Sequence, residues 1–208
     1  MSMIYLIGGA PRTGKSIVSN LLMSEVSAPC LSTDVLRTVV HDLLPKEDRA
    51  AAFPFGGFTS ADELSSMQIK QMVDWQVIEG DSLRKCIDSL VRHQVGVKDN
   101  QILEGVHLMP EHVSMLAADS KHAEPVRAVF VFAKDVETQL DMMKKNTSHY
   151  DWLCDASDET YLSVANFVVA YGDWVRSECE RCDLPFVVRG GDFEKENEEI
   201  LRVLKEGK

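Results

Sequence analysis

Near its start the chain carries a segment whose residue types suit phosphate binding, Gly9-Ala10-Pro11-Arg12-Thr13-Gly14-Lys15-Ser16. It follows an apolar run and precedes a stretch with helical spacing, and it fits the pattern G-x-x-x-x-G-K-[ST]. Glycines let the backbone of such a loop point its N–H groups inward, and the start of the next helix adds partial positive charge. The sequence therefore predicts a phosphate-binding loop.

The polar side chains of this loop have predicted roles. Lys15 is expected to reach the β- and γ-phosphates of a nucleotide, and Ser16 to offer its hydroxyl to Mg²⁺. Lys15 is also expected to be exposed at the rim of the loop. Arg12 either adds charge over the phosphates or is a solvent-facing loop arginine. The predicted nucleotide-binding residues are Gly9, Ala10, Pro11, Arg12, Thr13, Gly14, Lys15, Ser16 and Ile17.

A second candidate group follows the next short apolar run, at Ser32-Thr33-Asp34. Open α/β sheets bind their ligands beyond the carboxyl ends of the strands. Because phosphoryl transfer to an alcohol needs a base or orienting group near the acceptor hydroxyl, we predict this role for Asp34. The alternative is that Asp34 only caps the following helix. Arg37, one turn later, is a candidate contact for an anionic acceptor.

A third candidate is Glu104, which ends a buried apolar run. An acid at the end of this strand would organise Mg²⁺ and its waters in a phosphate-loop protein. We therefore predict a role for Glu104 near the metal or the substrate. His107 and the residues after it either face the acceptor or begin the next helix.

These residues must be positioned by an alternation of strands and helices. Strands are predicted at residues 3–7, 29–32, 101–106, 126–133 and 185–188, and helices at 15–26, 35–44, 65–95, 136–145, 160–182 and about 194–204. Such alternation implies right-handed crossovers and an α/β fold with a parallel sheet covered on both faces. Residues 45–62 are expected to form a long irregular loop, and loops of this length are usually either functional or disordered. Its Phe53, Phe55 and Phe58 either stack on a ligand ring or fill the hinge of this region.

Composition limits the classes of protein. The 208 residues, 45% hydrophobic and 26% charged, suit one globular domain. The net charge of −11 disfavours nonspecific binding to nucleic acid or membranes. Spanning a bilayer takes about 20 apolar residues, and no apolar run approaches that length or suits a secretory signal, so a cytoplasmic location is expected.

Cysteine usage agrees with a reducing compartment, because the five cysteines are scattered and odd in number. Cys179 and Cys182 have the spacing of metal and redox sites, but no second pair or histidine cluster completes a ligand set. We interpret them as reduced, partly buried thiols.

Three segments, GGAPRTGKS, LSTDVLR and ILEGVHLMP, together resemble the small P-loop kinases grouped around 2-phosphoglycerate kinase, and more distantly chloramphenicol phosphotransferase and zeta toxins. The resemblance implies an adenylate-kinase-like sheet with strand order 2-3-1-4-5, and ATP with Mg²⁺ as phosphoryl donor. It also implies that adenine rests near Gly190-Gly191-Asp192. The catalytic residues carried over are Lys15, Asp34, Arg37 and Glu104, and the metal-binding residues are Ser16 and Glu104.

The chain departs from this group in the predicted lid, where residues 144–152 include no arginine. The role of a lid arginine then falls to Lys144, Lys145 or Arg12, although lysine lacks the bidentate geometry of arginine. The alternative is that the two lysines are a solvated helix end. Residues 146–157 are expected to be the mobile cover.

The resulting hypothesis is one P-loop kinase domain spanning 1–208, with a substrate-binding insert at about 45–95 and a lid at about 144–158. It is an ATP-dependent kinase of a small anionic or hydroxylated metabolite such as 2-phosphoglycerate, acting as a monomer or homodimer. The alternatives are a nucleoside or nucleotide kinase, or a slow ATPase switch that grips a protein. The basic residues available for an acceptor site are Arg37, Arg49, Lys70 and Arg84.

Overall fold

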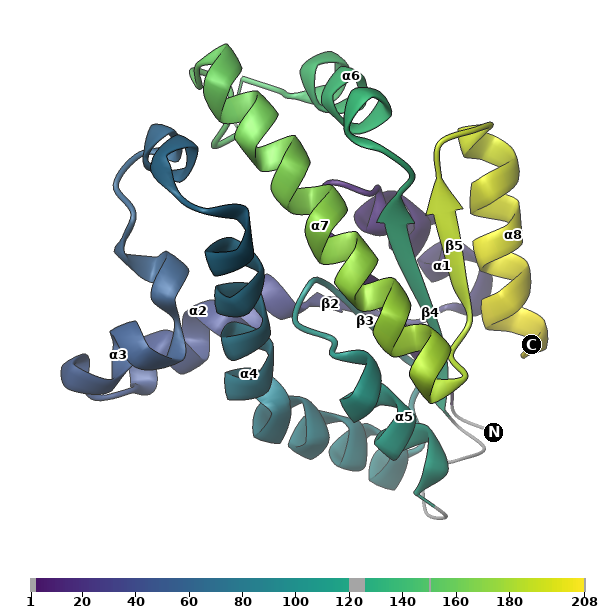
Figure 1. Cartoon of the computed structure of the whole chain (residues 1–208). Helices are drawn as coiled ribbons and strands as arrows, with labels where there is room; N and C mark the ends of the chain where they lie inside the picture. Colours follow the sequence, from purple (N-terminus) through teal and green to yellow (C-terminus); the bar gives the residue numbers. More distant parts are fainter. Residues whose placement is uncertain (1–2, 120–125, 150, 208) are drawn as a thin grey trace.

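Five parallel strands form one sheet in the computed structural model, which describes residues 3–119, 126–149 and 151–207 (Figure 1). The strand order is β2-β3-β1-β4-β5, with Ile7 of the central strand opposite Glu104 on one side and Val129 on the other. The strands are β1 Ile4–Gly9, β2 Cys30–Ser32, β3 Gln101–Glu104, β4 Val126–Ala133 and β5 Phe186–Arg189. The predicted α/β class and strand order are confirmed.

Helices connect the strands. The α-helices are α1 Lys15–Val26, α2 Thr33–Leu43, α3 Lys46–Ala52, α4 Ile69–Val97, α5 Pro110–Ala118, α6 Val136–Asn146, α7 Asp158–Cys182 and α8 Phe193–Glu206. Two short 3-10 helices, η1 Pro54–Gly57 and η2 Ala61–Ser66, precede α4. In Figure 1, α2, α3 and the start of α4 project away from the sheet.

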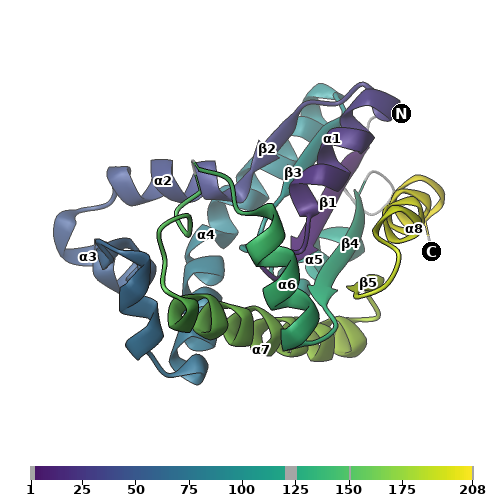
Figure 2. The same ribbon diagram turned by 90° about the horizontal axis from the view of Figure 1, so that it is seen from above.

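The sheet is covered on both faces because successive strand residues point to opposite sides. Tyr5 and Ile7 pack with buried residues of α1 and α8. Ile4 and Leu6 pack with buried residues of α4, α5 and α7 in the larger core (Figure 2). Burial on both faces explains why β1 is apolar along nearly its whole length.

The elements differ from the sequence prediction in several places. The strand predicted to end at residue 106 ends at Glu104, because Gly105 turns the backbone with a φ of 147°. The stretch 45–62 is not irregular, since it contains α3, η1 and the start of η2. These helices are too short for an apolar period to show in the sequence. Helix α4 begins at Ile69 rather than at 65, because a capping box of Ser60 and Glu63 starts η2 instead.

Hydrogen bonds fasten η2 to the start of α7. The Asp62 carboxylate accepts from the backbone N–H of Ser157 at 3.1 Å and from the hydroxyl of Thr160. The hydroxyl of Ser163 donates to the carbonyl of Leu64 at 3.1 Å. The projecting segment is thus held across the end of α7, on the side of the sheet covered by α4.

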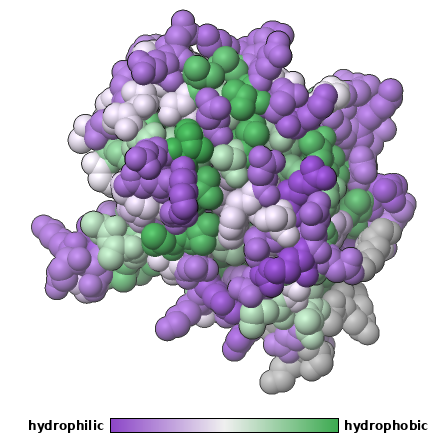
Figure 3. Space-filling view, in the orientation of Figure 1, coloured by the Kyte–Doolittle hydropathy of each residue, from purple (hydrophilic) through white to green (hydrophobic). Residues whose placement is uncertain are grey.

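The surface is dominated by polar residues. In Figure 3 hydrophilic residues cover most of the visible face, and hydrophobic residues form smaller patches between them. In the part of the chain that the structure describes, no helix combines the length and the apolar character needed to cross a bilayer.

Candidate active site

The predicted phosphate-binding loop joins β1 to α1, and its backbone conformation depends on two glycines. Gly9 has a φ of 119°, and a Cβ atom there would lie 2.0 Å from the carbonyl oxygen of Val131. Gly14, at the N-cap of α1, has a φ of 79°, and a Cβ there would lie 2.9 Å from the Phe193 ring. Arg12 between them also has a positive φ, 62°. Such a backbone brings successive N–H groups to one concave side, which suits an anion.

Arg189 supports this loop through a hydrogen bond to its backbone, a role that the sequence alone did not indicate. Its guanidinium is buried 4.2 Å from the centre of the Phe193 ring. Its Nε donates to the carbonyl of Thr13 at 3.2 Å, and its Nη2 donates to Asn197 at 2.6 Å. The signal available in the sequence was an arginine that directly follows the predicted strand at 185–188 and is the last residue of β5 in the structure.

Lys15 is buried rather than exposed at the rim, with 6% of its surface accessible. Its Nζ donates to the carbonyl of Ala10 in its own loop at 2.6 Å. Burial lowers the pKa of Lys15 from 10.5 to about 8, although the carboxylates of Glu104 and Asp34 act in the opposite direction. The prediction of an exposed lysine was wrong because the loop folds around the side chain.

Two neighbouring cavities lie at the carboxyl ends of the strands. The smaller, about 280 Å³, follows the phosphate-binding loop, and the larger, about 580 Å³, extends toward η2, α4 and α7. The smaller cavity is lined by Pro11, Arg12, Gly14, Lys15, Ser16, Ile17, Asp34, Glu104, Gly105, Val106 and Trp152. Five of these residues also line the larger cavity: Pro11, Arg12, Asp34, Val106 and Trp152. A phosphate held by the loop would therefore lie beside the larger cavity.

Two of the predicted loop residues, Ala10 and Thr13, hold the loop in place and do not line the smaller cavity. Ala10 and Thr13 are buried, and the hydroxyl of Thr13 donates to the carbonyl of Ala10 at 2.8 Å. The backbone N–H of Ala10 donates to Val131 at 3.0 Å. These contacts fix the loop to β4 rather than contacting a ligand through side chains.

Asp34 lies at the border of the two cavities, and 72% of its side chain is exposed. The backbone N–H of Asp34 donates to the hydroxyl of Ser32 at 3.2 Å, so Ser32 is the cap of α2. The alternative in which Asp34 only caps the helix is therefore wrong. Its carboxylate is available to a molecule in either cavity.

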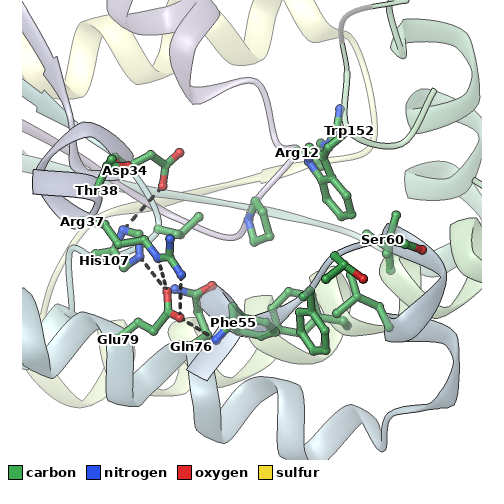
Figure 4. Close-up of a pocket in the computed structure, with 18 residues that line it drawn as sticks. Arg12, Asp34, Arg37, Thr38, Phe55, Ser60, Gln76, Glu79, His107 and Trp152 are labelled. Carbon is green, nitrogen blue, oxygen red and sulfur yellow. Dashed lines mark hydrogen bonds and ion pairs between the residues drawn. The ribbon is translucent and has the colours of Figure 1, made fainter. Parts of the chain in front are cut away.

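A buried network stands beside Asp34 in the larger cavity (Figure 4). Glu79 of α4 accepts from Arg37 Nε at 2.7 Å and Nη2 at 3.1 Å, and from the backbone N–H of Phe55 at 2.9 Å. His107 Nε2 lies 3.5 Å from the same carboxylate. Burial opposes the charge of Glu79, but the hydrogen bonds from His107, Arg37 and Phe55 lower its pKa below the usual value. Arg37 thus reaches the cavity already paired.

His107 faces the acceptor side of the site and does not begin a helix. Its ring is buried, and its Nδ1 lies 3.0 Å from the hydroxyl of Thr33 and 3.6 Å from Asp34. The next helix, α5, begins three residues later at Pro110. His107 therefore connects the Glu79 network to Asp34.

Glu79 was missed because a single acid in a long helix is usually a solvated residue. The available signal was its position: Met72, Gln76, Glu79 and Leu83 are spaced by three or four residues and share the buried face of α4. Two polar residues, Gln76 and Glu79, on the otherwise apolar buried face of α4 indicate that this face lines a polar cavity. Gln76 also lines the larger cavity.

Of the four basic residues considered for the acceptor site, only Arg37 lines the larger cavity. Arg49 donates to the carbonyls of Leu44 and Asp42 near the end of α2. Lys70 pairs with a neighbour on α4, and Arg84 contacts the sulfur of Met115. These three residues serve local structure.

The three phenylalanines of residues 53–58 lie in two different surroundings. Phe53 is buried in the core, with the Arg37 guanidinium carbon 5.5 Å from its ring centre. Phe55 and Phe58 line the larger cavity, where Phe55 also packs against Phe167 of α7.

The segment predicted to be a lid contacts the predicted phosphate-binding loop through Arg12. Arg12 forms an ion pair with Asp151, and its guanidinium carbon lies 5.5 Å from the centre of the Trp152 ring. Partial burial opposes ionisation of Asp151, but the hydrogen bond from Arg12 lowers its pKa. The nearby Leu153 is buried in the core.

The two lysines proposed for the lid point elsewhere. Lys144 pairs with Asp158, and Lys145 pairs with Asp141 at 2.6 Å. Neither lysine lines the two cavities. This arrangement favours the interpretation of a solvated helix end.

The donors around the smaller cavity suit Mg²⁺ held jointly with phosphates. Ser16, Asp34 and Glu104 all present oxygen atoms there, which is the ligand type Mg²⁺ prefers. Within the described residues, no group of three or more His, Cys, Asp or Glu side chains is placed to hold a metal ion by itself. Mg²⁺ usually completes its coordination with water and substrate phosphates.

The other predicted features have structural partners. The residues predicted to lie near adenine are Gly190, Gly191 and Asp192. The Glu196 carboxylate accepts from the backbone N–H groups of Gly190 and Gly191, and Asp192 caps α8. None of these three residues lines either of the two cavities. Cys179 is buried, and burial raises the pKa values of Cys179 and Cys182. Both cysteines are free thiols, as predicted.

Solved structures with a similar fold were found for this chain. A gluconokinase from Sinorhizobium meliloti 1021 matches with a TM-score of 0.51 and 14% identity, over 99% of this chain and 92% of that chain. The two chains therefore share a fold. A deoxyadenosine kinase from M. mycoides with bound dATP matches with a TM-score of 0.48 and 15% identity, over 97% and 98% of the two chains. No protein-family model matches this sequence, and neither does any curated protein.

Proposed function

We propose that this protein is an ATP-dependent kinase that phosphorylates a hydroxyl group of a small molecule. The observation that carries the proposal is the position of Asp34 at the border between the cavity of the phosphate-binding loop and the larger cavity. Phosphoryl transfer requires a donor phosphate and an acceptor hydroxyl to meet beside a base or orienting group. The P-loop kinase fold supports the same function.

In this proposal the loop N–H groups and Lys15 hold the β- and γ-phosphates in the smaller cavity. Ser16 and Glu104 hold Mg²⁺, which neutralises charge on the phosphates when bound. An acceptor hydroxyl in the larger cavity attacks the γ-phosphorus, and the bond to the bridging oxygen of the leaving ADP breaks. Asp34 accepts the hydroxyl proton. Residues 45–95 supply eight of the 18 residues that line the acceptor cavity, and residues 144–158 supply its cover.

The resemblance to the 2-phosphoglycerate kinase group makes that compound one candidate acceptor. A switch ATPase that grips a protein would not need an acceptor cavity of about 580 Å³ next to its phosphates. Enclosed cavities of about 300–1,000 Å³ are typical of small-molecule sites. The cavity therefore favours a small acceptor. As part of the same proposal, the enzyme is cytoplasmic.

Asp34→Asn tests the proposal, because it keeps the shape of the side chain and leaves the Ser32 cap in place. Acceptor-dependent ADP release should fall by at least about 100-fold, the lower range of general-base contributions. The thermal stability and ATP affinity should stay close to those of the unmodified protein. Asp42→Asn, on the same helix but outside both cavities, is the matched control. Full transfer activity of Asp34→Asn would contradict the role of Asp34.

A further inference from the structure

The larger cavity has a charged end and an apolar end (Figure 4). Asp34, Arg37, Glu79 and His107 form the charged end, next to the phosphate-binding loop. The mainly apolar end is lined by Phe55, Phe58, Leu64, Val164 and Phe167, with Thr59, Ser60 and Ala61 of the neighbouring segment. An acceptor that fills both ends has a polar part near Asp34 and an apolar part farther away.

The charges at this site do not favour an anionic acceptor. The two cationic groups lining the cavity are already paired: Arg37 with Glu79 and Arg12 with Asp151. Asp34 adds a carboxylate without a cationic partner of that kind. An acceptor with its own phosphate or carboxylate would meet the carboxylate of Asp34, 72% of whose side chain is exposed. Because like charges at short range cost free energy, an uncharged acceptor suits this end better.

The apolar end is aromatic and suits a flat ring. The ring centres of Phe55 and Phe58 lie 6.0 Å apart, and Phe167 stands 6.0 Å from Phe55. Figure 4 shows Trp152 on the wall opposite Phe55. Aromatic walls on two sides contact the faces of an unsaturated ring over a large area.

Gln76 stands between the two ends, with the labelled Glu79 on one side of it and Phe55 on the other (Figure 4). Gln76 is 5% exposed, and among the described residues its Nε2 has no hydrogen-bond partner. An unsatisfied buried amide costs free energy that a ligand group can recover. An amide offers both a donor and an acceptor, which matches a ring edge carrying both.

We propose that the acceptor is an uncharged compound in which a hydroxyl-bearing part is joined to a flat ring with a hydrogen-bonding edge, the chemical class of the nucleosides. The inference rests on the proposed kinase function of the same site. The ring lies between Trp152 and Phe55, Gln76 binds its edge, and the hydroxyl lies at Asp34. A three-carbon acid such as 2-phosphoglycerate has no ring for the aromatic walls.

The first test is calorimetric binding in the presence of Mg²⁺ and a nonhydrolysable ATP analogue. The probes are adenosine, guanosine, cytidine and thymidine, each nucleoside's 5′-monophosphate, ribose and 2-phosphoglycerate. We expect at least one nucleoside to bind at least about tenfold more tightly than its monophosphate, ribose or 2-phosphoglycerate. Tighter binding of 2-phosphoglycerate, or no binding of any nucleoside, would overturn the inference.

The second test uses Gln76→Met, which keeps the length of the side chain and removes the amide. The KM for the best nucleoside should rise at least about tenfold, since a binding hydrogen bond is lost. The melting temperature should not fall, because no internal hydrogen bond of Nε2 is removed. Gln71→Met, at an exposed position of the same helix, is the matched control. An unchanged KM in a stable Gln76→Met variant would remove Gln76 from the acceptor site.

The two proposals fail in different ways. If ATP binds and 2-phosphoglycerate or another ring-free acceptor releases ADP in an Asp34-dependent manner, the kinase function stands and the ring acceptor is rejected. If nucleosides bind but no acceptor releases ADP above the acceptor-free rate, the cavity assignment stands and the kinase function is rejected.

Discussion

The two cavities that meet at Asp34 are built in different ways. The smaller is made mainly of one short loop, whose backbone and neighbouring helix are the parts that we propose bind phosphate. The larger gathers side chains from α2, η2, α4 and α7, and its Arg37 and Glu79 pair with each other before any ligand arrives. Under the proposed function, donor binding would then depend on a local segment of the chain, whereas the choice of acceptor would depend on packing between distant elements.

Lys15→Ala should break the donor side most strongly. Removing a preorganised cation from the phosphates should weaken ATP binding and lower transfer by about 10²–10³-fold. Nucleoside binding to the larger cavity without nucleotide should change little. Calorimetry measures both affinities, and Lys70→Ala, an exposed lysine, is the control. Equal ATP affinity of Lys15→Ala and the unmodified protein would refute the donor site.

Glu79→Gln should lower the free energy of unfolding, because it removes one partner of the buried ion pair in the larger cavity. Removing one partner of a buried ion pair costs about 3–5 kcal/mol, and we expect the lower end because Arg37 is partly exposed. The pKa of Glu79 is held below its usual 4.5, so its stabilising contribution is complete above about pH 4.5 and is lost as the pH falls through the lowered value.

Chemical unfolding at several pH values checks this effect. The difference in unfolding free energy between Glu79→Gln and the unmodified protein should be largest near pH 7 and shrink toward pH 3. ATP affinity should be retained. A difference that does not depend on pH would show that the charge of Glu79 contributes nothing to folding.

Arg12→Ala should have a smaller effect, because it removes the link between the donor loop and the lid. Loss of the charge-assisted bonds to Asp151, and of the contact with Trp152, should lower transfer by about tenfold. Arg12→Lys should recover only part of the rate, since lysine lacks the bidentate fork. Trp152 fluorescence on adding an ATP analogue and acceptor reports the lid directly, and an identical response in Arg12→Ala would separate Arg12 from lid movement.

Replacing Lys144 and Lys145 together by alanine should have the smallest effect. Both side chains pair with acids outside the two cavities, and such exposed pairs contribute little free energy. Transfer should change by less than about twofold in steady-state assays, close to the expected effect of exposed pairs. A tenfold loss would mean that the lid rearranges to bring a lysine to the phosphates.

The sequence by itself determined the parts of the protein that depend on neighbours along the chain. The phosphate-binding loop follows from Gly9, Gly14 and Lys15 at fixed spacing between a strand and a helix. The parallel sheet follows from the alternation of apolar strands with helices. The acids Asp34 and Glu104 follow from their positions after strands, because parallel strands end at one edge of a sheet.

Only the tertiary structure decided which side chains meet across that edge. Glu79 lies 42 residues from Arg37 in the chain, and Arg12 lies 139 residues from Asp151, so no local pattern links either pair. The burial of Lys15 depends on how the loop packs around its side chain. The choice of Ser32 and not Asp34 as the cap of α2 depends on where that helix begins. Spacing along the chain specifies elements, whereas burial and pairing depend on contacts between elements, and these contacts formed the acceptor cavity.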